Sequence, residues 1–251
     1  MKHTVQIKKL SIGEGMPKIC VPVTGADSCE ILSQAEQIKN AGPDLVEWRA
    51  DFYENLKEKS AVEDMLESLG AVLGDIPLLF TVRTGREGGN VRLTPEEYED
   101  ILVHAASCVA ADVLDVEIMP DQESAVRIID AAHGQGKPVI GSNHHFEGTP
   151  SNDTIDCIFS CMEQAGADIL KMAVMPNNSR DVIRMMERTL SWNEKSDRPM
   201  ITMSMGKLGG VSRMCGELTG SCMTFGSVTA ASAPGQIPMD LLKKVLWLMH
   251  E

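Results

Sequence analysis

Short apolar runs alternate with longer amphipathic stretches along most of the chain. Eight β-rich runs lie at residues 19–23, 45–49, 78–83, 113–118, 138–143, 168–174, 199–205 and 222–226. The stretches between them carry apolar residues at helical spacing, and several begin at Ser or Thr and end at Gly, as helices commonly do. Strands that alternate with helices in this way predict a parallel sheet with helical crossovers.

Eight such units favour closure of the sheet into a single (β/α)8 barrel, the TIM barrel, although an open doubly wound sheet would show the same alternation. The first residues, VQIKKLSIGEG, alternate polar and apolar positions around a glycine turn and predict a β-hairpin that closes the bottom of the barrel. A single barrel commonly has this length. We therefore expect one domain over 1–251, with the hairpin in 1–17 and the barrel in 18–251.

Charge and cysteine content narrow the classes of function. The net charge of −13 works against binding to nucleic acid or to an anionic membrane, because both are polyanions. The seven cysteines are scattered and form no C-x-x-C pair, which argues against a disulfide framework or a zinc knuckle and indicates a reducing compartment. With no apolar run typical of a signal peptide or a membrane span, we expect a cytoplasmic protein.

Polar residues occur at the ends of the predicted strands. In a barrel, these ends line the mouth of the active site. The residues concerned are Glu47, Arg49, Arg83, Glu87, Asp115, Glu117, Asn143, His144, His145 and Lys171. Any one pair, such as Asp115 with Lys171, could be a structural ion pair. So many charges at one mouth would cost much desolvation if they only stabilised the fold, and they therefore indicate a site for a polar ligand.

Lys171 and His144 together suggest a particular chemistry. Lys171 lies in the apolar segment ADILKMAVMP, where desolvation and nearby cations would favour the neutral amine. A neutral amine can attack a ketone and form a Schiff base, which acts as an electron sink. His144 could remove a proton α to the imine and later protonate a departing hydroxyl, with Glu87 orienting its imidazole.

These segments resemble those of type I 3-dehydroquinate dehydratases (type I dehydroquinases), the Schiff-base class. The resemblance extends over essentially the whole chain, through VEWRADF, LLFTVRTGREGG, SNHHFEGTP, ADILKMAVMP, ITMSMGKLGGVSRMCGE and TFGSVTAASAPGQIP. It implies a syn elimination of water from 3-dehydroquinate to give 3-dehydroshikimate in the shikimate pathway, without metal or nucleotide. It also implies a homodimer.

The resemblance assigns roles to individual residues. Lys171 is expected to condense with the C3 ketone, His144 to act as base and acid, and Glu87 to orient His144. Arg213 is expected to bind the substrate carboxylate, which suits a bidentate guanidinium. The remaining substrate-binding residues are expected around the ring hydroxyls and on a loop that closes over the ligand: Glu47, Arg49 and Arg83 for the hydroxyls, Ser232 and Gln236 for the loop.

One departure from the family pattern bears on activity. The family usually has Asp where this chain has His145, directly after the catalytic histidine. His145 replaces a negative group by a titratable one and could lower the pKa of His144. Adjacent residues of a strand point to opposite faces, which would limit the effect.

Two other classes of function are compatible with parts of the pattern. A metal-dependent barrel enzyme could use His144, His145 and Glu147 with Asp115 or Glu117, but neighbouring strand residues do not share a face and are poorly spaced for one ion. A non-catalytic barrel could bind a small polyhydroxy carboxylate through the same arginines. Loss of Lys171 or His144 would favour that second class, and both residues are present.

Overall fold

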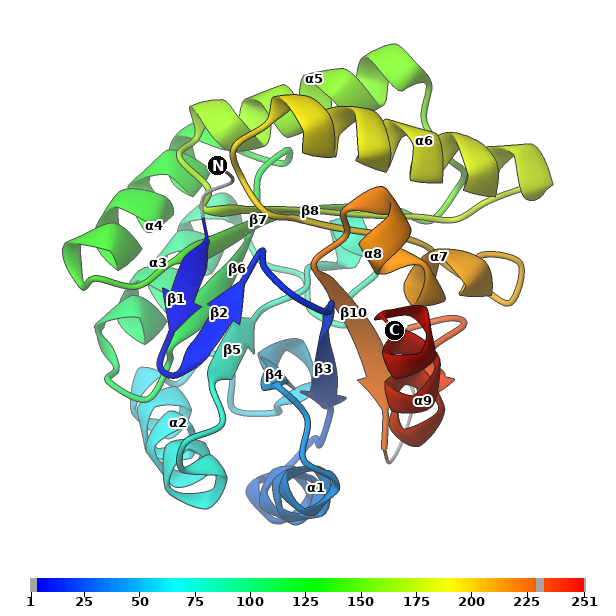
Figure 1. The fold of residues 1–251 in the computed structure, drawn as a ribbon. Coiled ribbons are helices and arrows are strands. Elements are labelled where there is room, and N and C mark those ends of the chain that lie inside the picture. The colour runs from blue at the N-terminus through cyan, green and yellow to red at the C-terminus, as the bar shows by residue number, and fades with distance from the viewer. Residues whose placement is uncertain (1–3, 229–232, 251) are drawn as a thin grey trace.

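The computed structural model describes residues 4–228 and 233–250, and its main sheet curls into a (β/α)8 barrel (Figure 1). Eight parallel strands follow one another as β3 to β9, with β10 beside β3. A parallel bridge between Met200 and Ser221 joins β9 to the segment before β10, and Cys222 N donates to Met200 O at 2.7 Å. The predicted barrel is confirmed.

All eight predicted strands are present. Their bounds are β3 (Lys18–Val23), β4 (Leu45–Arg49), β5 (Leu78–Thr81), β6 (Val113–Glu117), β7 (Val139–His145), β8 (Ile169–Val174), β9 (Met200–Ser204) and β10 (Met223–Ser227), and the short β11 (Ile237–Pro238) extends the sheet beside β10. Strand β5 ends two residues earlier than predicted, because Arg83 N donates to the side chain of Asp51 instead of to a neighbouring strand. Arg83 therefore belongs to the loop that follows β5.

Helices surround the strands (Figure 1). They are α1 (Ser28–Ala41), α2 (Lys59–Leu73), α3 (Pro95–Ser107), α4 (Gln122–Gly134), α5 (Asn152–Gln164), α6 (Ser179–Lys195), α7 (Gly210–Met214), α8 (Gly216–Thr219) and α9 (Met239–His250), with short 3-10 turns η1 (Ala50–Phe52) and η2 (Gly85–Glu87). Their starts follow the sequence: Thr94 and Glu97 form a capping box at α3, and Ser151 caps α5. Among the described residues, no helix is long and apolar enough to cross a bilayer.

The core has two layers. One lies between the sheet and the helices, and the other fills the inside of the barrel. The hairpin of β1 (Val5–Ile7) and β2 (Leu10–Ile12) belongs to the inner layer, where Val5, Ile7 and Ile12 pack with residues at the starts of strands, including Leu45 and Val113. The hairpin thus closes the bottom of the barrel, as predicted, and leaves the carboxyl ends of the strands for polar side chains.

Candidate active site

A pocket at the carboxyl ends of the strands brings together nearly all the residues predicted from the sequence. Its lining includes Glu47, Arg49, Arg83, Glu87, His144, Lys171, Met203, Met205, Arg213, Phe225 and Gln236. The chain contributes them from strands β4, β7, β8, β9 and β10, from α7 and from the loops that follow β5 and β10. Ser232, the other predicted substrate-binding residue, lies outside the described residues.

Lys171 is buried on β8, and its nearest polar neighbours are carboxylates. Its Nζ donates to Asp115 Oδ2 at 2.7 Å and lies 3.7 Å from Glu47 Oε1. The ring of Phe225 covers it on another side, with the centroid 4.5 Å from Nζ. The expectation that Lys171 has apolar surroundings was therefore wrong. The fold brings two acids, Asp115 and Glu47, to this amine from distant parts of the chain.

Asp115 links Lys171 to Arg83. Its Oδ1 accepts from Arg83 Nη2 at 2.7 Å and from Ser142 Oγ at 2.6 Å. Burial alone would raise the pKa of Asp115, but Arg83, Lys171 and His144 hold this pKa well below its usual range. From the sequence, Asp115 was expected at the barrel mouth, as a possible ion-pair partner of Lys171 or a possible metal ligand. In the structure it pairs with both Lys171 and Arg83.

Arg83 is the most extensively paired cation of the pocket. Besides Asp115, its Nη1 donates to Glu117 Oε1 at 3.0 Å and lies 3.4 Å from Glu87 Oε2. Burial lowers the pKa of Arg83, but the three carboxylates raise it well above its ordinary value. The guanidinium therefore remains charged and fixes the positions of the acids around it.

His144 and Glu87 form the predicted pair. Nδ1 of His144 lies 2.8 Å from Glu87 Oε2, and Asn143 Nδ2 donates to Glu87 Oε1 at 2.9 Å. Burial, followed by Arg83 and Lys171, lowers the pKa of His144 well below its usual value. Burial, followed by the charge of Glu117, raises the pKa of Glu87 to about 8. The imidazole is therefore uncharged near neutral pH, as a general base requires.

Glu47 and Arg49 come from the end of β4, and each has a partner. Thr81 Oγ1 donates to Glu47 Oε1 at 2.9 Å. The guanidinium of Arg49 makes a bidentate pair with Asp51, with Nε to Oδ1 at 2.7 Å and Nη2 to Oδ2 at 2.8 Å. Asp51 was not singled out from the sequence, although its position two residues after Arg49 was a possible signal.

Arg213 differs from the other arginines of the pocket. It is 1% exposed and has no carboxylate partner among the described residues. Its Nη1 lies 3.4 Å from Met203 Sδ, and its Nη2 donates to Pro234 O at 3.2 Å. Its Nε has no hydrogen-bond partner in the part of the chain that the structure describes. Burial lowers its pKa to about 10. A buried guanidinium with free donors is suited to bind an anion.

The proposed metal ligands are not grouped. Among the described residues, the ligand-type atoms close enough to share an ion belong to Glu63 on α2, His104 on α3 and Cys108 directly after α3. His145 is half-buried, and its Nε2 has no hydrogen-bond partner within residues 4–228 and 233–250. Burial lowers the pKa of His145. Its influence on His144 stays a prediction.

Comparisons with known proteins agree with this geometry. The family model for type I 3-dehydroquinase matches residues 19–251. The 3-dehydroquinate dehydratase of Listeria welshimeri is 41% identical to this chain over 249 residues, which cover 99% of both chains. The 3-dehydroquinate dehydratase of Clostridioides difficile is also 41% identical, over 255 residues that cover 100% of this chain and 99% of the relative.

Solved structures agree as well. A crystal structure of type I 3-dehydroquinate dehydratase from Clostridium difficile, with covalently modified comenic acid, superposes with a TM-score of 0.96 at 41% identity and covers 100% of this chain and 99% of its own. The 3-dehydroquinate dehydratase of Geobacillus kaustophilus gives 0.96 at 34% identity, with coverage of 99% and 98%. The resemblance found in the sequence is thereby confirmed, and the chain belongs to the type I 3-dehydroquinase family.

Proposed function

We propose that this chain is a hydro-lyase that converts 3-dehydroquinate to 3-dehydroshikimate through a Schiff base on Lys171. The observation that carries the proposal is Arg213, a buried cation in the pocket that also holds Lys171 and the His144–Glu87 pair. No described residue offers Arg213 a carboxylate partner. A substrate carboxylate would supply the missing negative charge. The names of the relatives, all 3-dehydroquinate dehydratases, support the same reaction.

Substrate binding begins at Arg213 in this proposal. The carboxylate of 3-dehydroquinate accepts from the guanidinium, and the ring hydroxyls lie toward Glu47, Arg49 and Arg83. The contact from Arg213 Nη2 to Pro234 O connects the anion site to the segment that includes Gln236. We propose that Gln236 and Ser232 belong to a loop that closes over the ligand and excludes water.

The chemical steps use three side chains. Lys171 Nζ, once deprotonated, attacks the ketone carbon, and loss of water from the carbinolamine gives the imine. Nε2 of His144 removes a proton from the carbon next to the imine carbon while Glu87 holds Nδ1. The electron pair moves through the imine, and His144 returns the proton to the departing hydroxyl. Hydrolysis of the product imine restores Lys171. The proposal involves neither metal nor nucleotide.

The setting of the enzyme is also part of the proposal. We place it in the cytoplasm, in the shikimate pathway that leads to the aromatic amino acids, as a homodimer whose subunits each contain one barrel domain. Size-exclusion chromatography with light scattering tests the assembly. A monomeric mass at micromolar concentration would contradict it.

Intact-protein mass spectrometry after borohydride treatment with 3-dehydroquinate tests the Schiff base. We expect a covalent adduct in the wild type and none in Lys171→Ala. Lys137→Ala is the matched control, because Lys137 is a partly buried lysine that lies outside the pocket. Its adduct should equal that of the wild type.

Circular dichroism establishes that both variants are folded. An adduct that survives in folded Lys171→Ala would place the nucleophile elsewhere. Absence of any adduct and of turnover in the wild type would favour the non-catalytic barrel that binds a polyhydroxy carboxylate.

A further inference from the structure

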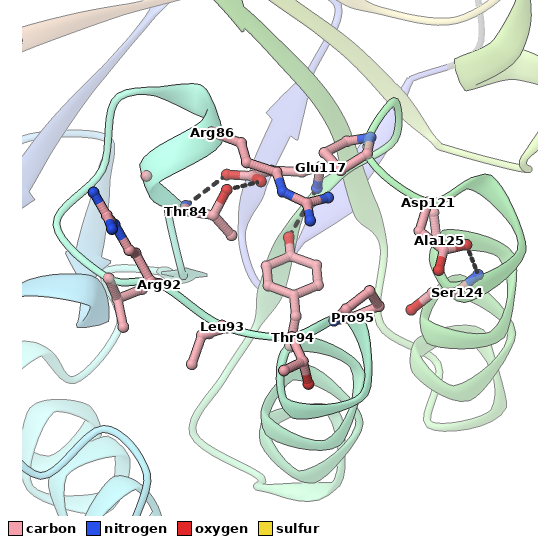
Figure 2. A pocket seen from close by; sticks show the side chains of 14 residues that line it. Thr84, Arg86, Arg92, Leu93, Thr94, Pro95, Glu117, Asp121, Ser124 and Ala125 are labelled. Carbon is pink, nitrogen blue, oxygen red and sulfur yellow. Dashed lines mark hydrogen bonds between the residues drawn. The ribbon is translucent and has the colours of Figure 1, made fainter.

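A second cavity of about 350 Å³ lies outside the barrel, between the loop that follows β5 and the first turns of α3 and α4. Figure 2 shows Thr84, Arg86 and Arg92 on the loop side, with Thr94 and Pro95 at the start of α3 and Ser124 and Ala125 at the start of α4. Its volume is within the range of pockets for small organic ligands. No residue assigned to the reaction above lines this cavity, although Thr84 and Arg86 are direct sequence neighbours of Arg83 and Glu87.

The loop at residues 82–94 separates this cavity from the active site. Arg83, Glu87 and Gly88 line the active-site pocket, whereas Thr84, Gly85 and Arg86 line the second cavity. The loop is well fixed: Thr84 N and Oγ1 donate to the carboxylate of Glu117 at 2.8 and 2.7 Å, and Gly85 N donates to Val91 O at 2.8 Å. A ligand in the second cavity would therefore touch the segment that carries Glu87.

The charged groups of the cavity leave an excess of unpaired positive charge. Its two carboxylates are occupied, since Glu117 accepts from Arg83 and Thr84, and Asp121 caps α4 by accepting from Ser124 N at 3.1 Å. Arg86 and Arg92, in contrast, have no hydrogen bond or ion pair within residues 4–228 and 233–250. Both are exposed at the cavity, on a protein with a net charge of −13.

Tyr98 provides a further donor. It is 8% exposed, and its hydroxyl oxygen accepts from Glu117 N at 2.9 Å. A phenol can accept and donate at once, and its proton has no acceptor among the described residues. A buried hydroxyl that lines a cavity with an unused donor favours a ligand that brings an acceptor.

The wall also carries the hydroxyl-bearing side chains of Thr84, Thr94 and Ser124. Its apolar part comes from Val91, Leu93, Pro95, Pro120 and Ala125, together with the ring of Tyr98. Apolar walls with a few polar groups are typical of sites for small organic molecules. We propose that this cavity binds a small aromatic monocarboxylate, with the carboxylate at Arg86 and Arg92 and the ring against the apolar wall.

Binding there is coupled to the active site through the shared loop. The ligand contacts residues 84–86 on one side of this hydrogen-bonded loop, and any displacement of them moves Glu87 relative to His144, which changes kcat more than KM. This kinetic consequence rests on the proposed function, whereas the binding itself does not.

Titration of the full chain with 2-naphthoate, followed by isothermal calorimetry and by the fluorescence of the probe, tests the site. We expect one saturable site whose affinity falls at least tenfold in Arg86→Ala/Arg92→Ala and in Ala125→Leu, which fills the cavity. Ala131→Leu is the matched control on α4 outside the cavity, and its affinity should equal that of the wild type. Arg213→Met should also retain binding, which separates this site from the active site.

Three results would overturn the proposal. The first is the absence of saturable binding in the wild type, and the second is binding that survives in folded Ala125→Leu but is lost in Arg213→Met, which would place the probe in the active site. The third is equal affinity for neutral 2-naphthylmethanol, which would refute the role of the arginines.

Two kinetic results separate the coupling from the proposed function. An unchanged kcat in the presence of saturating 2-naphthoate would refute the coupling even if the proposed reaction occurs. A wild type that binds the probe but lacks turnover would instead count against the proposed function.

Discussion

Replacement of Arg213 by methionine should make the protein more stable and abolish its activity. The side chain is buried at 1% exposure without a carboxylate partner among the described residues, so its charge lowers the stability of the fold. Methionine is shorter, but it keeps an unbranched apolar chain and carries no charge. Binding of a substrate carboxylate depends on the guanidinium, and the same substitution therefore removes the function that we propose for this residue.

The magnitude follows from the pKa of Arg213. Burial lowers this pKa from 12.5 to about 10, which corresponds to a desolvation cost of about 3 kcal/mol. The contacts to Met203 Sδ and Pro234 O return about 1 kcal/mol in total. Arg213→Met should therefore raise the free energy of unfolding by about 2 kcal/mol. For a chain of this size, the melting temperature would rise by roughly 4–8 °C.

Arg49→Met is the matched control, because Arg49 is also buried in the same pocket but is paired. Its removal leaves the carboxylate of Asp51 without its bidentate partner, which should lower the free energy of unfolding by about 3 kcal/mol. Differential scanning calorimetry and urea titration of both variants, with steady-state kinetics, measure the contrast. The two substitutions remove the same charge and should shift stability in opposite directions.

Destabilisation of Arg213→Met by more than 1 kcal/mol would refute the reasoning, since it would mean that an unpaired buried arginine stabilises this fold. Retained kcat/KM in that variant would refute its role as the carboxylate site.

Further predictions concern the charge network. Asp115→Asn leaves Arg83 and Lys171 facing a neutral amide and should cost about 3–5 kcal/mol in urea titrations; a loss below 1 kcal/mol would contradict the pairing. The pKa of Asp115 is lower in the folded than in the unfolded chain, so the ionised side chain stabilises the fold. This stabilisation is complete above the unfolded pKa of about 4 and is lost as the pH falls further. The urea midpoint of the wild type should therefore decline below pH 4 more steeply than that of Asp115→Asn. The pKa of Glu87 is raised to about 8. While Glu87 is protonated, it donates to Nδ1 of His144, so the single proton of the neutral imidazole sits on Nε2 and this atom cannot act as the base. We therefore expect kcat/KM to rise with pH toward about 8, and a profile already flat from pH 5 would count against this. Gly89→Ala would place a Cβ 1.8 Å from Arg83 O, so the loop must move and kcat should fall at least tenfold; wild-type kinetics would show that the loop position is unimportant.

The sequence determined the frame and the main reacting groups. Buried parallel strands appear as apolar runs, and charged residues at their carboxyl ends are expected at the mouth of a barrel. That is why the strands, the hairpin and the positions of Lys171 and His144 could be predicted. The role of Arg213 required the family resemblance, since α7 shows no barrel-strand pattern.

Only the tertiary structure decided which charges are paired. Asp115 lies 56 residues before Lys171, and Glu87 lies 57 residues before His144. The spacing in the chain does not fix such contacts, because they depend on how neighbouring strands and loops are packed. The same packing gives Arg49 a carboxylate partner and leaves Arg213 without one among the described residues. Arg49 and Arg213, which look alike in the sequence, thus differ in the energy of their buried charge, since the cost of a buried charge depends on what lies within hydrogen-bonding distance.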